Sequence, residues 1–410
     1  MNTIFAAIML IVPLTLSWQI NRKINIRFNP YSVMVIIWAI MIILATVLGD
    51  KIGLYPLEVS GIMISIIFLT FIGIIVYIFG VRSHYPLKAT EYQDIDDVIL
   101  NDDRLIKTLM IISTVLWIIG NIMYFFDLNR YIPLVALPSQ LWRWKNLILT
   151  GVINENSLRY LGRNLNIIGL IFALNFKINK TKKGFLLLLA YVLVSFIDVR
   201  KDTIIISLIY VLIPFVGRKS KSIIKILFPL GAMFIVFFVF TIQELNFGTV
   251  NWERIIGIYT FGSFNSLQKA LSVGMNSQNN LFMGNSFYFV YSILKYIIPS
   301  LAPSGITLET LGSDSTNVYT TLIPVVLDSD NWFEFWSIFF IYSLYIGVII
   351  VVSINYFNRK PSLQSYILYC SVFSCAVRTF YNPTFSYMDI LFAFIYMMLI
   401  SFIAHLGRRR

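Results

Sequence analysis

Residues 244–331 carry side chains suited to holding a ligand with polar edges and apolar faces, such as a sugar. Aromatic rings stack on flat apolar faces, while amides and hydroxyls hydrogen-bond to ligand hydroxyls. A long ordered loop on a rigid scaffold is where binding and catalytic residues concentrate. The candidate residues of this stretch are Trp252, Arg254, Tyr259, Phe264, Lys269, Asn317, Tyr319, Thr320 and Asp328.

A second set of candidate residues is cationic and lies at or near the ends of hydrophobic segments. Arg200 stands in the short turn Asp198–Asp202, and Arg378 closes a later hydrophobic segment. Arg159 and Arg163 are four residues apart, so one face of a helix presents both. A guanidinium offers a planar fork of donors to phosphate, so these cations are typical of a diphosphate site. Two alternatives remain open: a self-neutralising cluster in the Asp198–Asp202 turn, and anchoring at lipid headgroups.

The composition indicates that these residues are positioned by membrane helices. Hydrophobic residues make up 58% of the chain, charged residues 13%, and the mean hydropathy is +0.78. A soluble chain is typically about a quarter charged. Runs of apolar residues recur at the length of about 20 residues that crosses a bilayer, without the alternation of a barrel strand. We expect an all-α polytopic membrane protein with about eleven transmembrane helices. The expected spans are 3–20, 31–49, 60–80, 106–126, 163–176, 184–198, 202–217, 222–243, 332–355, 362–381 and 385–406.

The distribution of Lys and Arg predicts that the N-terminus faces outward and the C-terminus inward. In that orientation basic residues occupy every short inward connection, including Arg22, Lys23, Arg359 and Arg408–Arg410. The net charge of +12 then follows from attraction to an anionic inner leaflet. We therefore expect the lipid bilayer, and no nucleic acid, as the partner of the positive charge.

This topology divides the chain into three regions. Residues 1–243 form an eight-helix region with an outward connection at 127–162, and residues 332–410 form a three-helix region. Between them, 244–331 is a large outward loop with helical or re-entrant segments. Its apolar part 284–301 is expected to be re-entrant or to lie at the interface, because a further span would place the C-terminal arginines outside.

An outward site in this chain lacks the usual histidine base and metal ligands. His84 and His405 both fall on the inward side, and no phosphate-binding loop or His/Cys cluster is present in the sequence. The candidate bases are Asp328, Glu244, Glu253, Asp314 and Glu309, and partial burial at the start of a span would raise the pKa of Asp328. The competing interpretation of Asp328 is a helix N-cap or first-turn acid. We expect no metal and no cofactor.

Three short segments resemble the O-antigen polymerase (Wzy) family of oligosaccharide repeat-unit polymerases. Val199–Ile205 is similar to a short outward turn whose Arg opens the next helix. Tyr259–Phe264 resembles the family's aromatic-glycine patch, and Thr316–Thr321 followed by Asp328 resembles its Asn-Thr-Tyr-Thr motif and the Asp beyond it. The family continues from that Asp to two glycines, whereas this chain continues with Ser329–Glu334.

The resemblance implies a GT-C-like fold and a substrate, a repeat oligosaccharide on polyprenyl diphosphate, polymerised at the outer face of the bacterial inner membrane. It also implies a chain-length regulator protein as a partner. The catalytic residues it favours are Arg200, Arg378 and Asp328. The substrate-binding residues it favours are Arg159, Arg163, Arg254, Lys269, Tyr259, Asn317, Tyr319 and Thr320.

Two other functions fit the same sequence. An O-antigen ligase-type glycosyltransferase uses a similar lipid-linked donor, but that group uses an outward histidine. A flippase or other transporter of polysaccharide units is the rival from a different class. Transporters usually carry charged or helix-breaking residues at mid-membrane, and the predicted span centres here are nearly free of charge.

Overall fold

The computed structural model is helical throughout the residues it describes, with no strand among them. The described residues are 2–24, 29–80, 103–133, 147, 158, 252–273, 275, 281–301, 319–359, 363–386, 391, 393–395, 397–399, 401 and 402. The chain divides into two compact units. The first contains Met1–Leu87 and Asn251–Ile400, and the second contains Lys88–Val250 and Ser401–Arg410.

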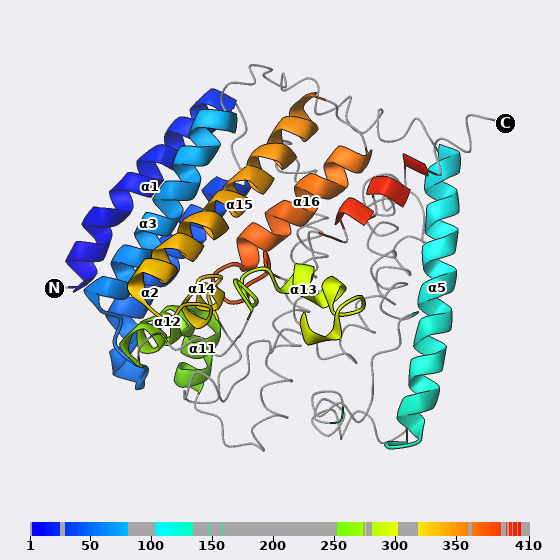
Figure 1. Cartoon of the computed structure of the whole chain (residues 1–410), viewed down its shortest axis with the longest axis horizontal. Coiled ribbons are helices and arrows are strands. Elements are labelled where there is room, and N and C mark those ends of the chain that lie inside the picture. Colours follow the sequence, from blue (N-terminus) through cyan, green and yellow to red (C-terminus); the bar gives the residue numbers. More distant parts are fainter. Residues whose placement is uncertain are drawn as a thin grey trace. The chain divides into compact units, whose positions relative to one another are not determined.

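Five long helices form the frame of the first unit (Figure 1). Two of them begin at a side-chain cap: before α2, Asn29 accepts the backbone N–H of Ser32 at 2.9 Å, and before α15, Asn331 accepts that of Glu334 at 3.0 Å. The Glu334 carboxylate in turn accepts a hydrogen bond from the backbone N–H of Asp330 at 2.9 Å, so this helix start is held from both sides. The helices are α1 (Asn2–Ile24), α2 (Pro30–Leu48), α3 (Val59–Ile75, continued by the π-turn η2, Val76–Gly80), α15 (Trp332–Arg359) and α16 (Leu363–Arg378).

A set of buried aromatic rings joins α2, α3 and α15. The Trp38 ring stacks on Phe68 at 5.4 Å between centroids, and Phe68 meets Phe339 edge-on at 5.9 Å. Gly347 lets α15 approach Ile75 so closely that an added Cβ would lie 2.9 Å from it. The opposite faces of these helices expose large apolar side chains, which is how lipid-facing helices are built.

Five described helices are long and apolar enough to cross a membrane. They are Asn2–Ile24, Pro30–Leu48, Val59–Gly80, Ile111–Asn129 and Trp332–Arg359. Each overlaps a span expected from the sequence, so the all-helical class is confirmed for the described residues, and these five helices support a membrane protein. The expected spans 163–176, 184–198, 202–217 and 222–243 lie outside the described residues, as does much of 385–406.

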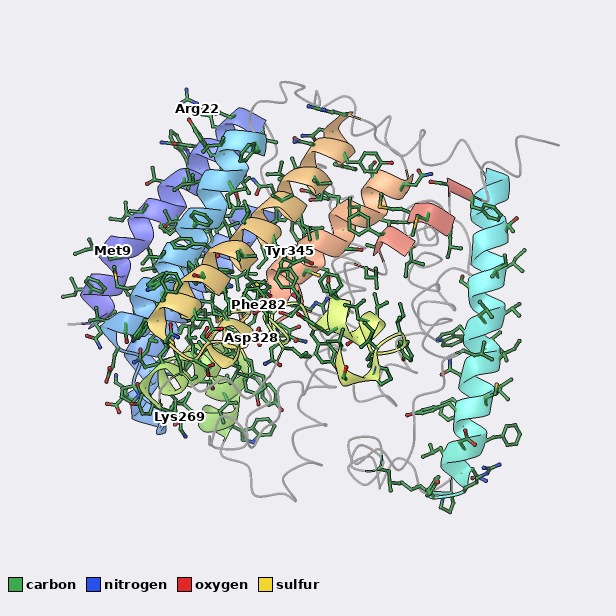
Figure 2. The ribbon with its side chains drawn as sticks, in the orientation of Figure 1. Met9, Arg22, Lys269, Phe282, Asp328 and Tyr345 are labelled. Atoms are coloured by element: carbon green, nitrogen blue, oxygen red, sulfur yellow. The ribbon has the colours of Figure 1, made fainter. Side chains whose placement is uncertain are left out.

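The first unit has two distinct ends. At one end Lys23 bonds to the Tyr77 hydroxyl, and Asn355 near Arg359 donates to the Phe79 carbonyl at 3.5 Å. At the other end the Asn2 amide donates to the Leu57 carbonyl at 3.1 Å. We call the first the basic end and the second the opposite end. Figure 2 shows Arg22 at the basic end of α1, and Lys269 beyond the other end of that helix.

The described part of 244–331 packs into the first unit as short helices. Gln268 accepts the N–H of Gly61 at 2.8 Å, Asn265 donates to the Tyr55 carbonyl at 2.6 Å, and Gly257 lies directly against Ile52. These contacts dock the segment on the α2–α3 connection, at the opposite end. The elements are η1 (Asp50–Ile52), α11 (Trp252–Thr260), α12 (Gly262–Val273), α13 (Tyr288–Leu294), η5 (Pro299–Leu301) and α14 (Ile323–Leu327).

The described helix of the second unit is α5 (Asp103–Asn129), 27 residues long. It exposes an apolar face that includes Ile111, Ile122 and Phe126. An exposed ion pair joins Arg130 to Asp127 at 3.5 Å just after its end. Its length and exposed face fit a membrane-spanning helix.

Candidate functional site

Many of the buried polar groups of the first unit gather on four segments. These are 283–289, 319–329, Tyr342 with Tyr345 on α15, and 378–386. We call this group the polar cluster. In Figure 2 Phe282, Asp328 and Tyr345 lie together where α13, α14 and α15 come close. Buried polar groups are usually hydrogen-bonded, so the partners of the cluster residues show what holds each of them in place.

Asp328 holds the turn that begins the 283–289 segment. It is 3% exposed and follows the last residue of α14. Its two carboxylate oxygens accept the backbone N–H groups of Asn285 at 2.9 Å and Ser286 at 2.7 Å. The turn starts at Met283, whose φ of 57° lies in the left-handed region that non-glycine residues rarely adopt. The carboxylate therefore maintains a strained backbone conformation.

Burial raises the pKa of Asp328 above its ordinary value, while hydrogen bonds from Asn285 and Ser286 lower it in part. The direction agrees with the sequence expectation. The alternative role expected for this residue, an N-cap or first-turn acid of the following span, is wrong. Asn331 caps α15, because the chain turns once more between Asp328 and the start of that helix.

Two backbone hydrogen bonds join the 319–321 segment to the residues that follow α16. The Tyr319 N–H donates to the Tyr381 carbonyl at 3.1 Å, and the Thr321 N–H donates to the Thr379 carbonyl at 2.9 Å. The two segments run antiparallel, since the partner number falls as the donor number rises. This pairing brings the residues next to Arg378 against the Tyr-Thr-Thr segment, although about sixty residues separate them in sequence.

A chain of hydroxyl groups crosses the cluster. The Tyr342 hydroxyl shares hydrogen bonds with Thr321 Oγ1 at 2.9 Å and with Ser386 Oγ at 2.8 Å. The Ser386 carbonyl accepts the N–H of Phe289 at 3.0 Å. The Tyr345 hydroxyl donates to the carbonyl of Phe385, the residue before Ser386, at 3.3 Å. All four segments of the cluster are thus linked by hydrogen bonds.

The polar cluster lies level with the middle of the long helices. Tyr345 stands 13 residues after the first residue of α15 and 14 before its last (345 − 332 and 359 − 345). Thr379 accepts a bond from the indole N–H of Trp38 at 2.9 Å, and Trp38 stands 8 residues after the start of α2 and 10 before its end (38 − 30 and 48 − 38). At 1.5 Å per residue, each of these levels is about 12–21 Å from a helix end.

Arg378 shares this depth because it precedes Thr379. It is 3% exposed, and its Nε donates to the Ser374 carbonyl at 3.3 Å. From the sequence we expect Arg378 at the outer edge of a full span over 362–381. The structure instead ends α16 at Arg378 after 16 residues, level with the middle of α2. An ionisable residue at such a depth is rare and marks functional sites.

Several buried polar atoms of the cluster have no hydrogen-bond partner among the described residues. They include the Tyr319 hydroxyl and Asn285 Oδ1. Burial also raises the pKa of Tyr319, so its hydroxyl stays protonated as a donor. A buried polar atom without a partner is costly, and a hydroxyl-rich ligand or bound water would satisfy it.

The structure brings four of the sequence candidates into one cluster: Tyr319, Thr320, Asp328 and Arg378. Thr320 is fully buried, and its hydroxyl accepts the N–H of Leu322 at 3.3 Å.

The other candidates lie elsewhere or outside the described residues. Tyr259 lies on α11, and burial raises its pKa. Lys269 lies on α12, away from Asp328 in Figure 2. Arg254 belongs to α11, but its side chain is outside the described set. Arg159, Arg163, Arg200 and Asn317 also lie outside the described residues.

The sequence reasoning missed four residues of the cluster: Asn285, Tyr342, Thr379 and Ser386. Two signals point toward them. Gly284-Asn285-Ser286 interrupts an apolar stretch, and Tyr342 with Tyr345 places two polar rings at one helical face in the centre of a span.

Comparison with known proteins adds no family to this picture. No protein-family model matches the chain, and searches of curated proteins and of solved structures also found no match. The functional argument therefore rests on the site itself.

Proposed function

We propose that the chain is a membrane glycosyltransferase that polymerises oligosaccharide repeat units carried on polyprenyl diphosphate, at the outer face of a bacterial inner membrane. The observation that carries the proposal is the antiparallel pairing of Tyr319–Thr321 with Thr379–Tyr381. It joins the segment that resembles the polymerase motif to the buried Arg378. A hydroxyl-lined cluster beside one cation suits a ligand that is part sugar and part phosphate.

The reaction needs little beyond positioning and charge stabilisation. A hydroxyl oxygen of the acceptor sugar forms a bond to the anomeric carbon of the donor glycan. The bond from that carbon to the diphosphate oxygen breaks, the diphosphate keeps the electron pair, and the hydroxyl proton passes to a base. The charge on the leaving diphosphate rises during this step. A guanidinium fixed in a low-dielectric environment stabilises that charge strongly.

Individual residues of the cluster take distinct roles in this proposal. Arg378 binds the leaving diphosphate, and Arg200 is the second cation expected from the sequence. Tyr319 and Thr320 bind the glycan. Asp328 acts through the turn it holds, because both of its oxygens already accept backbone N–H groups. We therefore assign Asp328 a positioning role.

A transporter of lipid-linked polysaccharide units is the second candidate, and one observation favours it. Membrane transporters bind their substrates where helices are broken at mid-depth. Here α16 ends level with the middle of α2, and α13 is 7 residues long. A ligase-type enzyme remains the alternative within the glycosyltransferases.

The surface polysaccharide of a strain lacking the gene distinguishes these functions. Gel analysis should show glycolipid with one repeat unit if the protein is a polymerase. Complementation with the wild-type chain should restore long chains, and Arg200→Ala should not. Complete absence of repeat units in the deletion strain would favour the transporter or the ligase and overturn the polymerase. Long chains of normal length from a stably expressed Arg200→Ala protein would remove that residue from the site.

A further inference from the structure

The segment 281–301 exposes a large apolar surface beside the polar cluster. Tyr296 is 83% exposed and Ile297 is 75% exposed, with Ile293 and Ile298 also exposed. In water such a surface would be unfavourable by about 25 cal/mol for each Å². Lys295 is the sole charged residue of 288–301, and its ammonium lies 5.5 Å from the centre of the Tyr296 ring.

The start of this segment is fixed at the level of the centre of α15. The Phe289 ring stacks on Tyr345 at 6.1 Å, and the Phe287 ring meets the same tyrosine at 5.1 Å. The exposed apolar stripe of α15 extends on both sides of this level, from Phe340 to Val352. Residue 289 is therefore at the depth where α15 presents hydrocarbon side chains to its surroundings.

Residues 289–298 stay within the hydrocarbon core, because a helix rises slowly along its axis. Helical hydrogen bonds of α13 continue through its end, with the N–H groups of Lys295 and Ile298 donating to the carbonyls of Tyr291 and Leu294. At 1.5 Å per residue, Ile297 lies at most about 12 Å from the level of Phe289. Half of the hydrocarbon core is about 15 Å thick. The exposed surface therefore falls within the hydrocarbon in whichever direction α13 points.

We propose that 281–301 is a re-entrant membrane segment whose surface at Ile293, Tyr296, Ile297 and Ile298 is covered by bilayer hydrocarbon. Non-helical backbone at this depth is tolerated where it is buried in protein or lines a water-filled cavity, so that its polar groups are satisfied. Asp328 and Ser386 provide that here, through the N–H groups of Asn285, Ser286 and Phe289.

The position of this segment has a consequence for substrate access, which rests on the proposed function. One part of the segment contributes to the polar cluster, and its exposed part contacts lipid. A substrate anchored in the bilayer by its polyprenyl chain would then reach the cluster sideways from the membrane.

A fluorescent reporter tests the lipid contact without substrate or activity. The chain has two cysteines, Cys370 and Cys375, and both are fully buried. An Ile297→Cys variant of the full chain can therefore be labelled selectively with an NBD dye and reconstituted in phosphatidylcholine vesicles. The matched control is Glu253→Cys on α11, an exposed position of the docked short helices. Unmodified protein gives the background labelling.

The proposal predicts that brominated phosphatidylcholine quenches the dye at position 297 strongly and that aqueous iodide quenches it several-fold less than at position 253. Iodide quenching at 297 equal to that at 253 would mean a water-exposed surface and overturn the proposal. Protection from both quenchers would also overturn it, because the surface would then be covered by protein or by a second copy. Neither result depends on whether the protein polymerises sugars.

Discussion

The ring-lined core of α2, α3 and α15 and the polar cluster lie at the same depth of one unit, yet they are built on opposite principles. In the core, continuous helices satisfy their own backbones, and Trp38, Phe68 and Phe339 fill the space between them. In the polar cluster the backbone is broken, and side chains must replace the missing helical hydrogen bonds. The packing of the core therefore stabilises the fold. The cluster lowers that stability, because it holds polar groups at mid-depth.

Removal of a core ring should give the largest loss of stability. Phe339→Ala leaves a cavity among Phe68, Phe335 and Trp336, and we expect a cost of about 3–5 kcal/mol, mainly from lost packing. The midpoint of thermal unfolding in detergent measures it. The adjacent Phe340→Ala is the control, since Phe340 is exposed. Equal midpoints for the two variants would contradict the assigned core.

The bond between Asp328 and its turn should be the most costly contact of the cluster to break. Asp328→Ala leaves the buried N–H groups of Asn285 and Ser286 without acceptors, at about 1–3 kcal/mol each. We expect a lower midpoint of thermal unfolding in detergent. The control Asp50→Ala, at an exposed position, should leave that midpoint unchanged. A variant Asp328→Ala with wild-type stability would show that the turn holds without the carboxylate.

Loss of one hydroxyl in the middle of the cluster should have a smaller effect. Tyr342→Phe keeps the ring but removes the bonds to Thr321 and Ser386, so we expect a loss of about 1–3 kcal/mol. The exposed Tyr55→Phe serves as the control for the chemical change in the same unit. If both variants unfold at the same midpoint, the hydroxyl chain contributes nothing to the stability of the cluster.

Titration of Asp328 should make the smallest contribution to the stability of the fold. Its folded-state pKa lies above the ordinary value of 3.8, so the folded protein binds this proton more tightly than the unfolded chain. Stability relative to Asp328→Asn should be greatest below that ordinary pKa and should fall as the pH rises through the folded-state pKa. Unfolding midpoints of both proteins from about pH 4 to about pH 7 measure the difference. If the unfolding midpoint of the wild type rises with pH relative to that of Asp328→Asn, the folded-state pKa of Asp328 is lowered and the account is contradicted.

The contrast between the two regions also explains what could be predicted from the sequence. The spans at 3–20, 31–49, 60–80, 106–126 and 332–355 were predictable, because a continuous apolar helix needs no information beyond its own residues. The depth at which α16 ends was not, since it depends on the pairing of Thr379 and Tyr381 with residues 319–321.

The candidate site was predictable only in part for the same reason. Asp328 and Tyr319 could be identified as candidates from their residue types and from the resemblance of their segment to a family. Their partners could not be identified, because the role of a serine or tyrosine in an apolar segment depends on the distant group to which it is hydrogen-bonded. Ser386 and Tyr342 are hydrogen-bonded although they lie 44 positions apart in the sequence, which no local pattern encodes.

The effect of Arg378 on chain length tests the central claim, that the polar cluster serves function rather than stability. Arg378→Met removes a charge that is costly to bury, and this gain offsets the loss of the hydrogen bond that Arg378 donates to the Ser374 carbonyl. We therefore expect Arg378→Met to unfold at or above the wild-type midpoint, while a strain that carries it accumulates glycolipid with one repeat unit. Arg359→Met at the basic end should keep long chains. Long chains of normal length from stably expressed Arg378→Met would contradict the account.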